Sequence, residues 1–392
     1  MTICPEERCT GCGACQSACP ADCITLALNR AGDRVAVIDE SRCTRCGKCS
    51  RICPVLHPPV LREIRTALAA YAVEAQVRQS SASGGAAAVL ARRVVESGGC
   101  AYGAAFTAPT TVELVRVNVP AQLSRLQGSK YVHAATGSAY RKVQSDLKAG
   151  RQVLFTGTPC QVAGLYAYLG SDPPGLTTCD LVCHGVPEAD TLNAYLQTEL
   201  NPAAIARLTF RDGDGWVMKA YDRDGGVLRR MDLKNSLYYN GFMEGYLYRS
   251  GCYTCPYATE KRVADLTLGD FWGIGEETPY PNAAAELKKG LSLILVHTDK
   301  GQALLNACAP ALVTTLRTPA EAVKKNHQLR HPTPDSPAAR RFHNLYGKKG
   351  AAYAIAHCNE KKRRTLCLRH IIRQCPPLLA LCRKIPKLRD KL

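Results

Sequence analysis

One cysteine pattern occurs twice in the first 54 residues, and it constrains the chain more than any other feature. Each copy reads Cys-x2-Cys-x2-Cys-x3-Cys-Pro, and the second begins 34 residues after the first. The copies comprise Cys9, Cys12, Cys15, Cys19 and Pro20, and then Cys43, Cys46, Cys49, Cys53 and Pro54. Three cysteines this close together can bind three irons of one iron-sulfur cube, but their short loop cannot reach the fourth iron.

The spacing is typical of a two-cluster bacterial ferredoxin, in which the fourth cysteine of each run binds the other cluster. The sequence therefore predicts two [4Fe-4S] clusters with crossed ligands. The first has the ligands Cys9, Cys12, Cys15 and Cys53, and the second has Cys43, Cys46, Cys49 and Cys19. The alternatives are a zinc site or a disulfide framework, but zinc ligands normally come in two pairs, whereas these cysteines come in threes plus one. Cys4 and Cys23 are left as packed or spare thiols.

Composition indicates the compartment and the number of domains. A chain of 392 residues with 46% hydrophobic residues is long enough for two or three domains with real cores. The N-terminus has no basic segment followed by an apolar run, and no stretch approaches the roughly 18 to 20 apolar residues that span a bilayer. We therefore expect the 21 cysteines to be in a reducing compartment, and the protein to be cytoplasmic.

The net charge of +18 is concentrated at the C-terminus, where residues 340–392 hold fifteen Lys and Arg against Glu360 and Asp390. The rest of the chain is nearly balanced, so we expect no nucleic-acid partner. The tail carries leucines and isoleucines beside its basic residues, and it could contact an anionic membrane surface or an acidic partner. A partly ordered, solvated extension is the favoured interpretation.

Strand and helix patterns alternate along the chain. Residues 24–28 and 35–38 predict a short hairpin inside the cysteine repeat. The pattern predicts strands at 100–106, 152–155, 179–183 and 291–297, and helices at 86–97, 138–149, 161–169 and 302–312. Three alternating runs at 207–212, 217–222 and 227–232 predict an antiparallel patch. Alternating strands and helices favour a mainly parallel sheet, whose ligands gather where strands end and helices begin.

Several loops between these elements carry residues that could bind a ligand or a metal. The serine and glycine loop before residue 86 suits a phosphate at a helix N-terminus, or it is simply a cap. Cys160 follows a strand and a glycine turn, where a thiolate is favoured near a helix N-terminus, but it could equally be a small buried hydrophobe. Cys183 is at the carboxyl end of the next strand. Cys252 and Cys255 form a single Cys-x2-Cys pair, which is half of a metal site or a redox pair.

The order of these motifs resembles the coenzyme F420 hydrogenase/dehydrogenase beta-subunit family over roughly residues 65 to 310. The matching motifs are Ser83-Gly84-Gly85, Gly128-Ser129-Lys130-Tyr131, Gly157-Thr158-Pro159-Cys160-Gln161, Asp180-Leu181-Val182-Cys183-His184-Gly185-Val186-Pro187, Gly251-Cys252-Tyr253-Thr254-Cys255 and Asp265 through Gly273. With the cysteine repeat in front, the arrangement is similar to F420H2 dehydrogenase subunits and to flavin and iron-sulfur reductases of chlorophyll intermediates. The basic tail has no counterpart, and no segment is recognisably specific for F420.

The resemblance implies an α+β fold with four parts. These are a two-cluster ferredoxin domain at 1–60, an N-terminal flavin region at 61–202, a C-terminal region of the same family at 203–335, and the basic tail at 336–392. The flavin-binding part is expected to be α/β, with a mainly parallel or mixed sheet and an antiparallel sub-region.

The resemblance also implies FAD and a third [4Fe-4S] cluster. The implied ligands of the third cluster are Cys160, Cys183, Cys252 and Cys255. The implied FAD contacts are Ser83, Gly84, Gly85, Ser129, Lys130, Gly157 and Thr158. Since clusters pass single electrons and a flavin can exchange one or two, these cofactors together predict a relay between one-electron carriers and hydride transfer. No catalytic side chain is required for that role.

The predicted function is an iron-sulfur flavoprotein oxidoreductase. Its expected partners are a soluble ferredoxin or another redox subunit, and a hydride carrier such as F420 or NAD(P)H. Two alternatives remain open at this point. One is a non-enzymatic electron-transfer adaptor for a partner enzyme, and the other is a ferredoxin-dependent reductase of an organic substrate.

Overall fold

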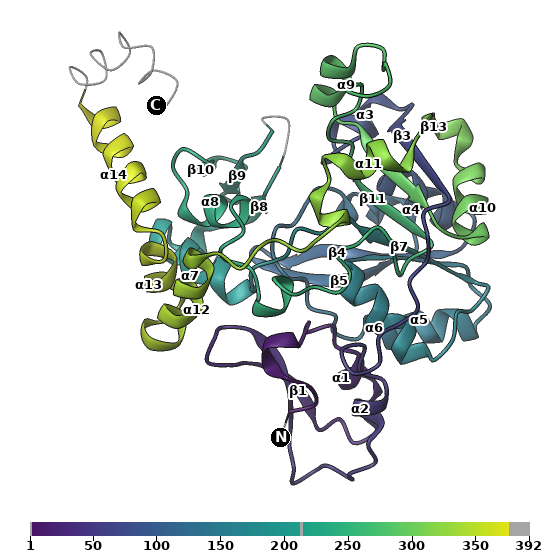
Figure 1. The fold of residues 1–392 in the computed structure, drawn as a ribbon, viewed down its shortest axis with the longest axis horizontal. Coiled ribbons are helices and arrows are strands. Elements are labelled where there is room, and N and C mark those ends of the chain that lie inside the picture. Colours follow the sequence, from purple (N-terminus) through teal and green to yellow (C-terminus); the bar gives the residue numbers. More distant parts are fainter. Residues whose placement is uncertain (1, 212–214, 376–392) are drawn as a thin grey trace.

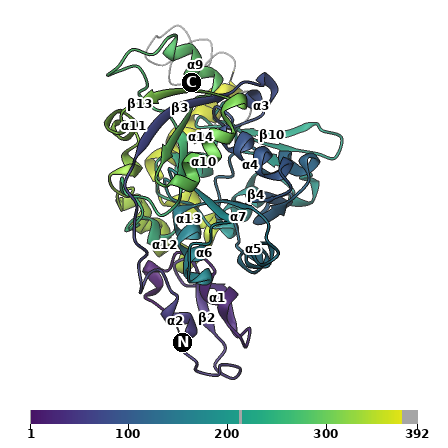
Figure 2. The same ribbon diagram turned by 90° about the vertical axis from the view of Figure 1, so that its right-hand side faces the viewer.

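The computed structural model describes residues 2–211 and 215–375. A small N-terminal unit projects from one side of a larger body, as both views of the ribbon show (Figures 1 and 2). The strands are β1 Ile24–Leu28, β2 Arg34–Ile38, β3 Thr66–Ala72, β4 Cys100–Ala108, β5 Thr111–Val117, β6 Val153–Gly157, β7 Leu176–Leu181, β8 Arg207–Thr209, β9 Met218–Tyr221, β10 Val227–Met231, β11 Leu266–Asp270, β12 Ser292–Val296 and β13 Leu312–Arg317. The α-helices are α1 Ala14–Ala18, α2 Lys48–Arg51, α3 Ala75–Gln79, α4 Ala86–Glu96, α5 Ala139–Lys148, α6 Pro159–Leu169, α7 Ala189–Glu199, α8 Leu237–Met243, α9 Ala283–Lys289, α10 Asp299–Ala307, α11 Pro319–Lys324, α12 Pro337–Lys349, α13 Ala351–His357 and α14 Glu360–Gln374.

The N-terminal unit contains the predicted hairpin, with β1 and β2 paired antiparallel. Its two short helices repeat one local design. Each begins after a glycine in the left-handed conformation, Gly13 at φ 77° before α1 and Gly47 at φ 69° before α2. A positive φ is easy for glycine and strained for other residues, so the Cys-Gly step in each cysteine run allows the chain to turn into a helix there. The hairpin prediction is confirmed.

One eight-stranded sheet organises the larger body, in the order β13-β3-β12-β11-β7-β6-β4-β5. The central strands β11, β7, β6 and β4 are parallel, whereas β5 on one side and β12, β3 and β13 on the other pair antiparallel. The sheet is therefore mixed rather than mainly parallel. Strands from residues 61–202 and from residues 203–335 share it, and β3 runs in the same direction as the parallel centre.

Helices cover both faces of the sheet, so its central strands are buried on both sides. In β6, Phe155 belongs to an apolar core with α5 and α6, while Leu154 belongs to the opposite core with α4. Successive side chains of a strand point to opposite faces, which explains why this strand is a continuous apolar run. The predicted strands at 100–106 and 152–155 and the helices at 86–97, 138–149 and 161–169 are confirmed.

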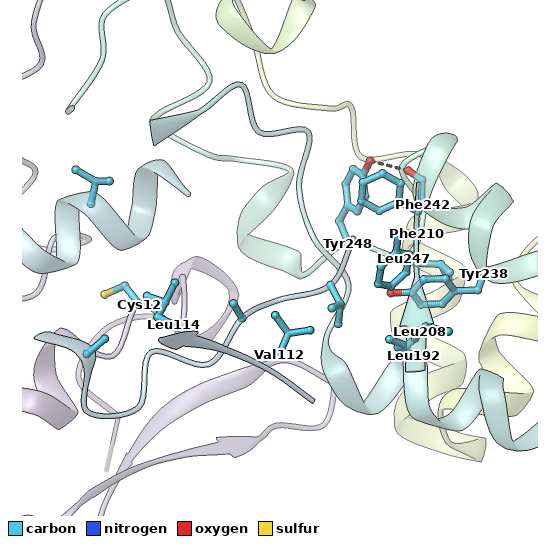
Figure 3. Close-up of a cluster of buried hydrophobic side chains, with 14 of the residues drawn as sticks. Cys12, Val112, Leu114, Leu192, Leu208, Phe210, Tyr238, Phe242, Leu247 and Tyr248 are labelled. Carbon is cyan, nitrogen blue, oxygen red and sulfur yellow. Dashed lines mark hydrogen bonds between the residues drawn. The ribbon is translucent and has the colours of Figure 1, made fainter. Parts of the chain in front are cut away.

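The antiparallel patch is confirmed as a three-stranded sheet in the order β10-β9-β8. Its core is continuous with the core under the main sheet. Figure 3 shows Cys12 of the N-terminal unit at one end of this cluster of buried side chains, and Phe210, Phe242 and Tyr248 at the other. The hydroxyl of Tyr248 donates to the carbonyl oxygen of Phe242 at 2.6 Å. The N-terminal unit, the sheet and the patch therefore share one packed interior.

The C-terminal segment is the main correction to the predicted fold. Its described part is not a solvated extension, because α12 and α13 pack against the body near α7 (Figure 1). Phe342 of α12 and Ile355 of α13 are each 2% exposed and belong to the main core. The imidazole of His343 also donates a hydrogen bond, at 2.9 Å, to the carbonyl oxygen of Ala31 in the β1–β2 turn. Basic residues outnumber acidic ones here, but the buried faces are apolar.

Two further differences are local. The helix predicted at 302–312 ends at Ala307, because the chain turns through Pro310 into β13, which pairs with β3. Strand β7 ends at Leu181, so Cys183 lies in the following loop and not on the strand. Among the helices of residues 2–211 and 215–375, none has both the length and the apolar character to cross a bilayer.

Candidate functional site

The four predicted ligands of the first cluster gather around one point in the N-terminal unit. Burial raises the pKa of the Cys15 thiol, and Cys12, Cys9 and Cys53 beside it raise that pKa further. Cys4, predicted to be a spare thiol, lies within hydrogen-bond reach of both Cys53 and Cys9, and these contacts are the largest cause of its raised pKa. The fourth cysteine of the second run thus lies with the first run, as the crossed pattern requires.

The predicted ligands of the second cluster form a separate group. Cys23 lies 3.3 Å from Cys19, sulfur to sulfur, and the Cys19 contact, then burial and Cys43, raise its pKa to about 12. Cys46 is exposed, and the backbone N–H of Lys48 lowers its pKa, which favours the thiolate that binds iron. The two spare cysteines therefore each touch the ligands of a different cluster.

Four cysteines of the larger body line one cavity, although they come from three distant segments. Cys160 is in the first turn of α6, Cys183 follows β7, and Cys252 and Cys255 lie in and after the short 3-10 helix Ser250–Cys252. Since β6 and β7 are neighbouring parallel strands, the segments that follow them leave from the same edge of the sheet. The structure therefore brings together all four residues predicted for the third cluster.

The local environment of these thiols reflects their burial and their closeness. Burial, and then Cys160, raise the pKa of Cys183 to about 12 and that of Cys255 to about 11. Thr158 is the N-cap of α6, and its hydroxyl lies 3.2 Å from the sulfur of Cys160. Four half-buried thiols pushed toward their neutral form need a positive centre to ionise together, which an iron-sulfur cluster supplies.

No group of three or more His, Cys, Asp or Glu in the described part of the chain is arranged to hold a metal ion. A site for a single metal ion requires ligands that converge on one point. The ligands of an iron-sulfur cube instead bind four separate irons at its corners. The cysteine groups fit the cube in residue type, number and grouping.

A buried arginine connects the cavity to the N-terminal unit. Arg249 is 2% exposed and lines the cavity. Its guanidinium donates to the carbonyl oxygen of Cys9 at 3.0 Å and to that of Arg34 at 2.9 Å. Gly11 is positioned where any side chain would collide with this guanidinium. The cation therefore lies between the first cluster's ligands and the cavity cysteines.

The charge of Arg249 has a buried carboxylate in direct contact. Its guanidinium lies 3.1 Å from the carboxylate of Glu188, and both side chains are 2% exposed. Burial alone would raise the pKa of Glu188, but the charge of Arg249 and the backbone N–H of Arg34, which donates to the Glu188 carboxylate at 2.9 Å, hold it below its ordinary value. Sequence reasoning missed this pair, because Glu188 and Arg249 are far apart in the chain and each merely flanks a cysteine motif.

The seven residues predicted to bind FAD are divided between the cysteine cavity and other parts of the body. Of these, Thr158 lines the cysteine cavity, and the others lie outside it. The Ser83-Gly84-Gly85 loop packs on β3 and β12, where the Ala72 N–H donates to the Gly84 carbonyl oxygen at 2.7 Å and a side chain at Gly84 would collide with Ala70. The hydroxyl oxygen of Ser83 is buried without a hydrogen-bond partner among the described residues.

Lys130 already has local partners. Its ammonium donates to the carbonyl oxygen of Gln127 at 2.8 Å and to that of Arg125 at 3.3 Å. Burial lowers the pKa of Lys130 to about 8. The side chain is therefore held in its own turn, with Ser129 beside it.

Aromatic rings that sequence reasoning did not single out lie next to this turn. The ring of Trp216 stacks on that of Tyr131 at 5.7 Å and on that of Trp272 at 6.2 Å. The Arg211 guanidinium lies 4.3 Å from the Trp216 ring centre and pairs with Asp270, the last residue of β11, at 2.8 Å. Trp272 was inside a recognised motif, but Trp216 had no pattern to mark it.

The fold and the cysteine groups together define an iron-sulfur protein of the electron-transfer class. Residues 8–56 match the model of the 4Fe-4S dicluster domain. Residues 150–322 match the model of the C-terminal part of the coenzyme F420 hydrogenase/dehydrogenase beta subunit. The chain thus joins a segment similar to a two-cluster ferredoxin domain to a segment similar to the C-terminal part of this beta subunit. The match confirms the resemblance for the motifs from Gly157 onward.

A solved structure is also similar to the chain, the F420-reducing [NiFe] hydrogenase complex from Methanosarcina barkeri, in a xenon derivative. The two are 18% identical, with a TM-score of 0.46, over 69% of this chain and 92% of that one. No curated protein matches the chain.

Proposed function

We propose that the protein is an iron-sulfur flavoprotein oxidoreductase that connects one-electron carriers to a hydride carrier. In this proposal Cys160, Cys183, Cys252 and Cys255 hold a third [4Fe-4S] cluster, and FAD binds at the carboxyl edge of the main sheet. The single observation that carries the proposal is the convergence of these four cysteines beside the first ferredoxin cluster.

The closeness of the two cysteine groups supports electron transfer between them. The N-terminal unit packs its first cluster's ligands onto α6, where a methyl group at Gly164 would lie 3.1 Å from the sulfur of Cys12. The hydroxyl of Thr136 donates to the Cys12 carbonyl oxygen at 2.9 Å. Cys12 and Cys160 are close enough for the charge of one thiolate to raise the pKa of the other thiol. Contacts on both sides therefore fix the first cluster against the body.

The sheet offers an extended edge for FAD. Ser83, Gly84 and Gly85 follow β3, and Gly157 and Thr158 follow β6, at the carboxyl ends of strands that run in the same direction. Four strand spacings separate β3 from β6 in the sheet order, which is roughly 19 Å. A dinucleotide can extend over such a distance, with a phosphate near α4 and the ring near Thr158 and the cysteines. The buried, unpartnered hydroxyl of Ser83 and the positive end of α4 suit a phosphate.

The flavin exchanges electrons singly or in pairs, which is what the coupling requires. The residues of the chain position the groups and set the electrostatics. Arg249 holds the N-terminal unit on the cavity, and Thr158 caps the helix that carries Cys160. The name of the matched family makes F420 the first hydride carrier to test, with NAD(P)H as the second.

An iron count after anaerobic purification tests the third cluster. Three [4Fe-4S] clusters predict about 12 iron atoms per chain. Cys160→Ser should remove about 4 of them and leave the two ferredoxin clusters reducible. Cys179→Ser is the matched control, because Cys179 is a fully buried cysteine outside the cavity, on β7. An iron count of about 12 in the Cys160 variant, with wild-type spectra, would contradict the ligand assignment.

The packing of the predicted flavin residues favours one alternative, an electron-transfer adaptor without flavin. Gly84 and Lys130 have internal partners that explain them without a ligand. FAD quantification of the same preparation decides between the two functions. About one FAD per chain supports the oxidoreductase, and a preparation with all its iron that does not bind added FAD supports the adaptor.

A further inference from the structure

The two ferredoxin clusters have unlike surroundings. The ligands of the first face the body, and Cys12 and Cys53 are each 8% exposed. The ligands of the second lie farther out, with Cys46 exposed and Cys43 and Cys49 partly so. Both views of the ribbon show α2, which carries Cys49, in the lobe that projects from the body (Figures 1 and 2). Electrons from outside therefore meet the second cluster first.

The chain segment that carries three ligands of this outer cluster is basic. Residues 41–57 contain no Asp or Glu, and the four cations among them are all exposed: Arg42, Arg45, Lys48 and Arg51. Among the described residues, no carboxylate forms an ion pair with Arg45, Lys48 or Arg51. Arg42 donates to the carbonyl oxygen of Ala21 at 3.0 Å and lies near Asp39. We call Arg42, Arg45, Lys48 and Arg51 the basic rim.

We propose that the basic rim is the docking surface for a small acidic one-electron carrier, which exchanges electrons with the outer cluster. Arg45 and Lys48 flank the exposed ligand Cys46 in the chain, so a carrier bound to the rim is close to the redox centre. The charges of Arg45, Lys48 and Arg51, which form no ion pair among the described residues, attract an acidic surface over a long range and guide the encounter. This inference rests on the electron-transfer class of the protein and names the partner's chemistry for the proposed function.

The step is balanced without any bond being made or broken. A reduced low-potential carrier loses one electron and is oxidised, and the outer cluster gains that electron and is reduced. The electron can then pass inward to the first cluster, which we call the inner cluster. Each cysteine run supplies one ligand to the other run's cluster, so the two clusters are close together, and the ligands of the inner cluster contact the body.

The test uses the full-length holoprotein and an acidic [2Fe-2S] ferredoxin as the probe. The test variant is Lys48→Glu/Arg51→Glu, which reverses two charges on α2. The matched control is Lys348→Glu/Lys349→Glu, which makes the same change at two exposed lysines that end α12. Two readouts are taken: the affinity between the two oxidised proteins by calorimetry, and the second-order rate of reduction by the reduced probe in anaerobic stopped flow.

For the wild type, affinity and rate should both fall as salt is raised, because exposed charges are screened. At low salt the Lys48→Glu/Arg51→Glu variant should lose about tenfold or more in both readouts and most of the salt dependence. The control should keep wild-type values. The neutral variant Lys48→Gln/Arg51→Gln should fall between the two, and dithionite should still reduce all clusters of each variant.

A second probe, a basic c-type cytochrome, distinguishes a loss of electrostatic attraction from a loss of the cluster or the fold in the variant. It should accept electrons from the reduced Lys48→Glu/Arg51→Glu variant faster than from the wild type. Equal behaviour of the variant and the wild type with the acidic probe, or an equal loss in the control, would overturn the inference. Normal docking without any electron delivery to flavin or hydride carrier would instead contradict the proposed function and leave the docking surface standing.

Discussion

At the scale of single residues, Arg249 has the most consequential environment in the described chain. It is a buried cation that touches the ligand loop of one cluster and the lining of the cavity, with Glu188 as its counter-charge. A buried pair of this kind adds little net stability by itself, but removing one partner leaves an uncompensated charge in the interior. The pair is thus a sensitive point for both stability and redox chemistry.

Replacing Arg249 with methionine should destabilise the protein by about 3–5 kcal/mol, because Glu188 would remain buried and charged. The double variant Arg249→Met/Glu188→Gln should recover part of that loss. Anaerobic denaturant unfolding, followed by the visible absorbance of the clusters, measures both effects. If the single and double variants unfold at the same denaturant concentration, the two side chains are not energetically coupled.

At the scale of elements, the contact between α1 and α6 aligns the ferredoxin unit with the body. Gly164 of α6 makes this contact possible, since a methyl group there would lie 3.0 Å from Cys12 Cβ and 2.7 Å from the hydroxyl of Tyr140. That hydroxyl donates to the carbonyl oxygen of Gln161 at 2.7 Å and is not free to move away. The loop that leads into α1 and helix α6 therefore touch at Cys12, with no room for a side chain at position 164.

Gly164→Ala should loosen the ferredoxin unit, even though alanine normally stabilises a helix interior by about 1 kcal/mol relative to glycine. The expected result is faster proteolysis in the connecting segment 57–65 and a changed spectrum of the inner cluster. Gly103→Ala is the control, because the nearest atoms there belong to Leu126 at 3.5 Å or more, an ordinary contact. A variant that is more resistant than the wild type would show that the helix gain exceeds the steric cost.

At the scale of the whole molecule, helices near the C-terminal end of the described chain contact the N-terminal ferredoxin unit. Helices α12 and α13 contribute Phe342 and Ile355 to the main core and reach the β1–β2 turn of the ferredoxin unit. Tyr346 packs over Gly32 in that turn, where a side chain would lie 2.6 Å from the tyrosine ring. The beginning and the later part of the chain are therefore held together by direct contact.

Two truncations test whether α12 and α13 stabilise the body and the ferredoxin unit. A chain that ends at residue 335 should unfold at a markedly lower temperature and lose iron, because Phe342 and Ile355 leave the core and each such loss costs about 2–5 kcal/mol. A chain that ends at residue 359 keeps both and should retain its clusters. Anaerobic thermal unfolding and iron per chain are the measurements, and equal behaviour of the two truncated chains would argue against a structural role for α12 and α13.

The sequence alone determined the local features of this protein. The spacing within each cysteine run specifies which thiols can share a cluster, because a few covalent bonds limit their separation. The hairpin between the runs and most of the helices were predictable for the same reason, since period and caps act within a few residues. The family resemblance likewise rests on short motifs in a fixed order.

The tertiary structure decided what joins those features. Nothing local brings Cys160 and Cys183 to Cys252 and Cys255, since their meeting depends on the order of strands in the sheet. The same holds for the Arg249–Glu188 pair, for the burial of α12 and α13, and for the face of the ferredoxin unit turned toward solvent. Contacts between distant residues follow from the packing of the whole core. The spacing of residues along the chain does not determine that packing.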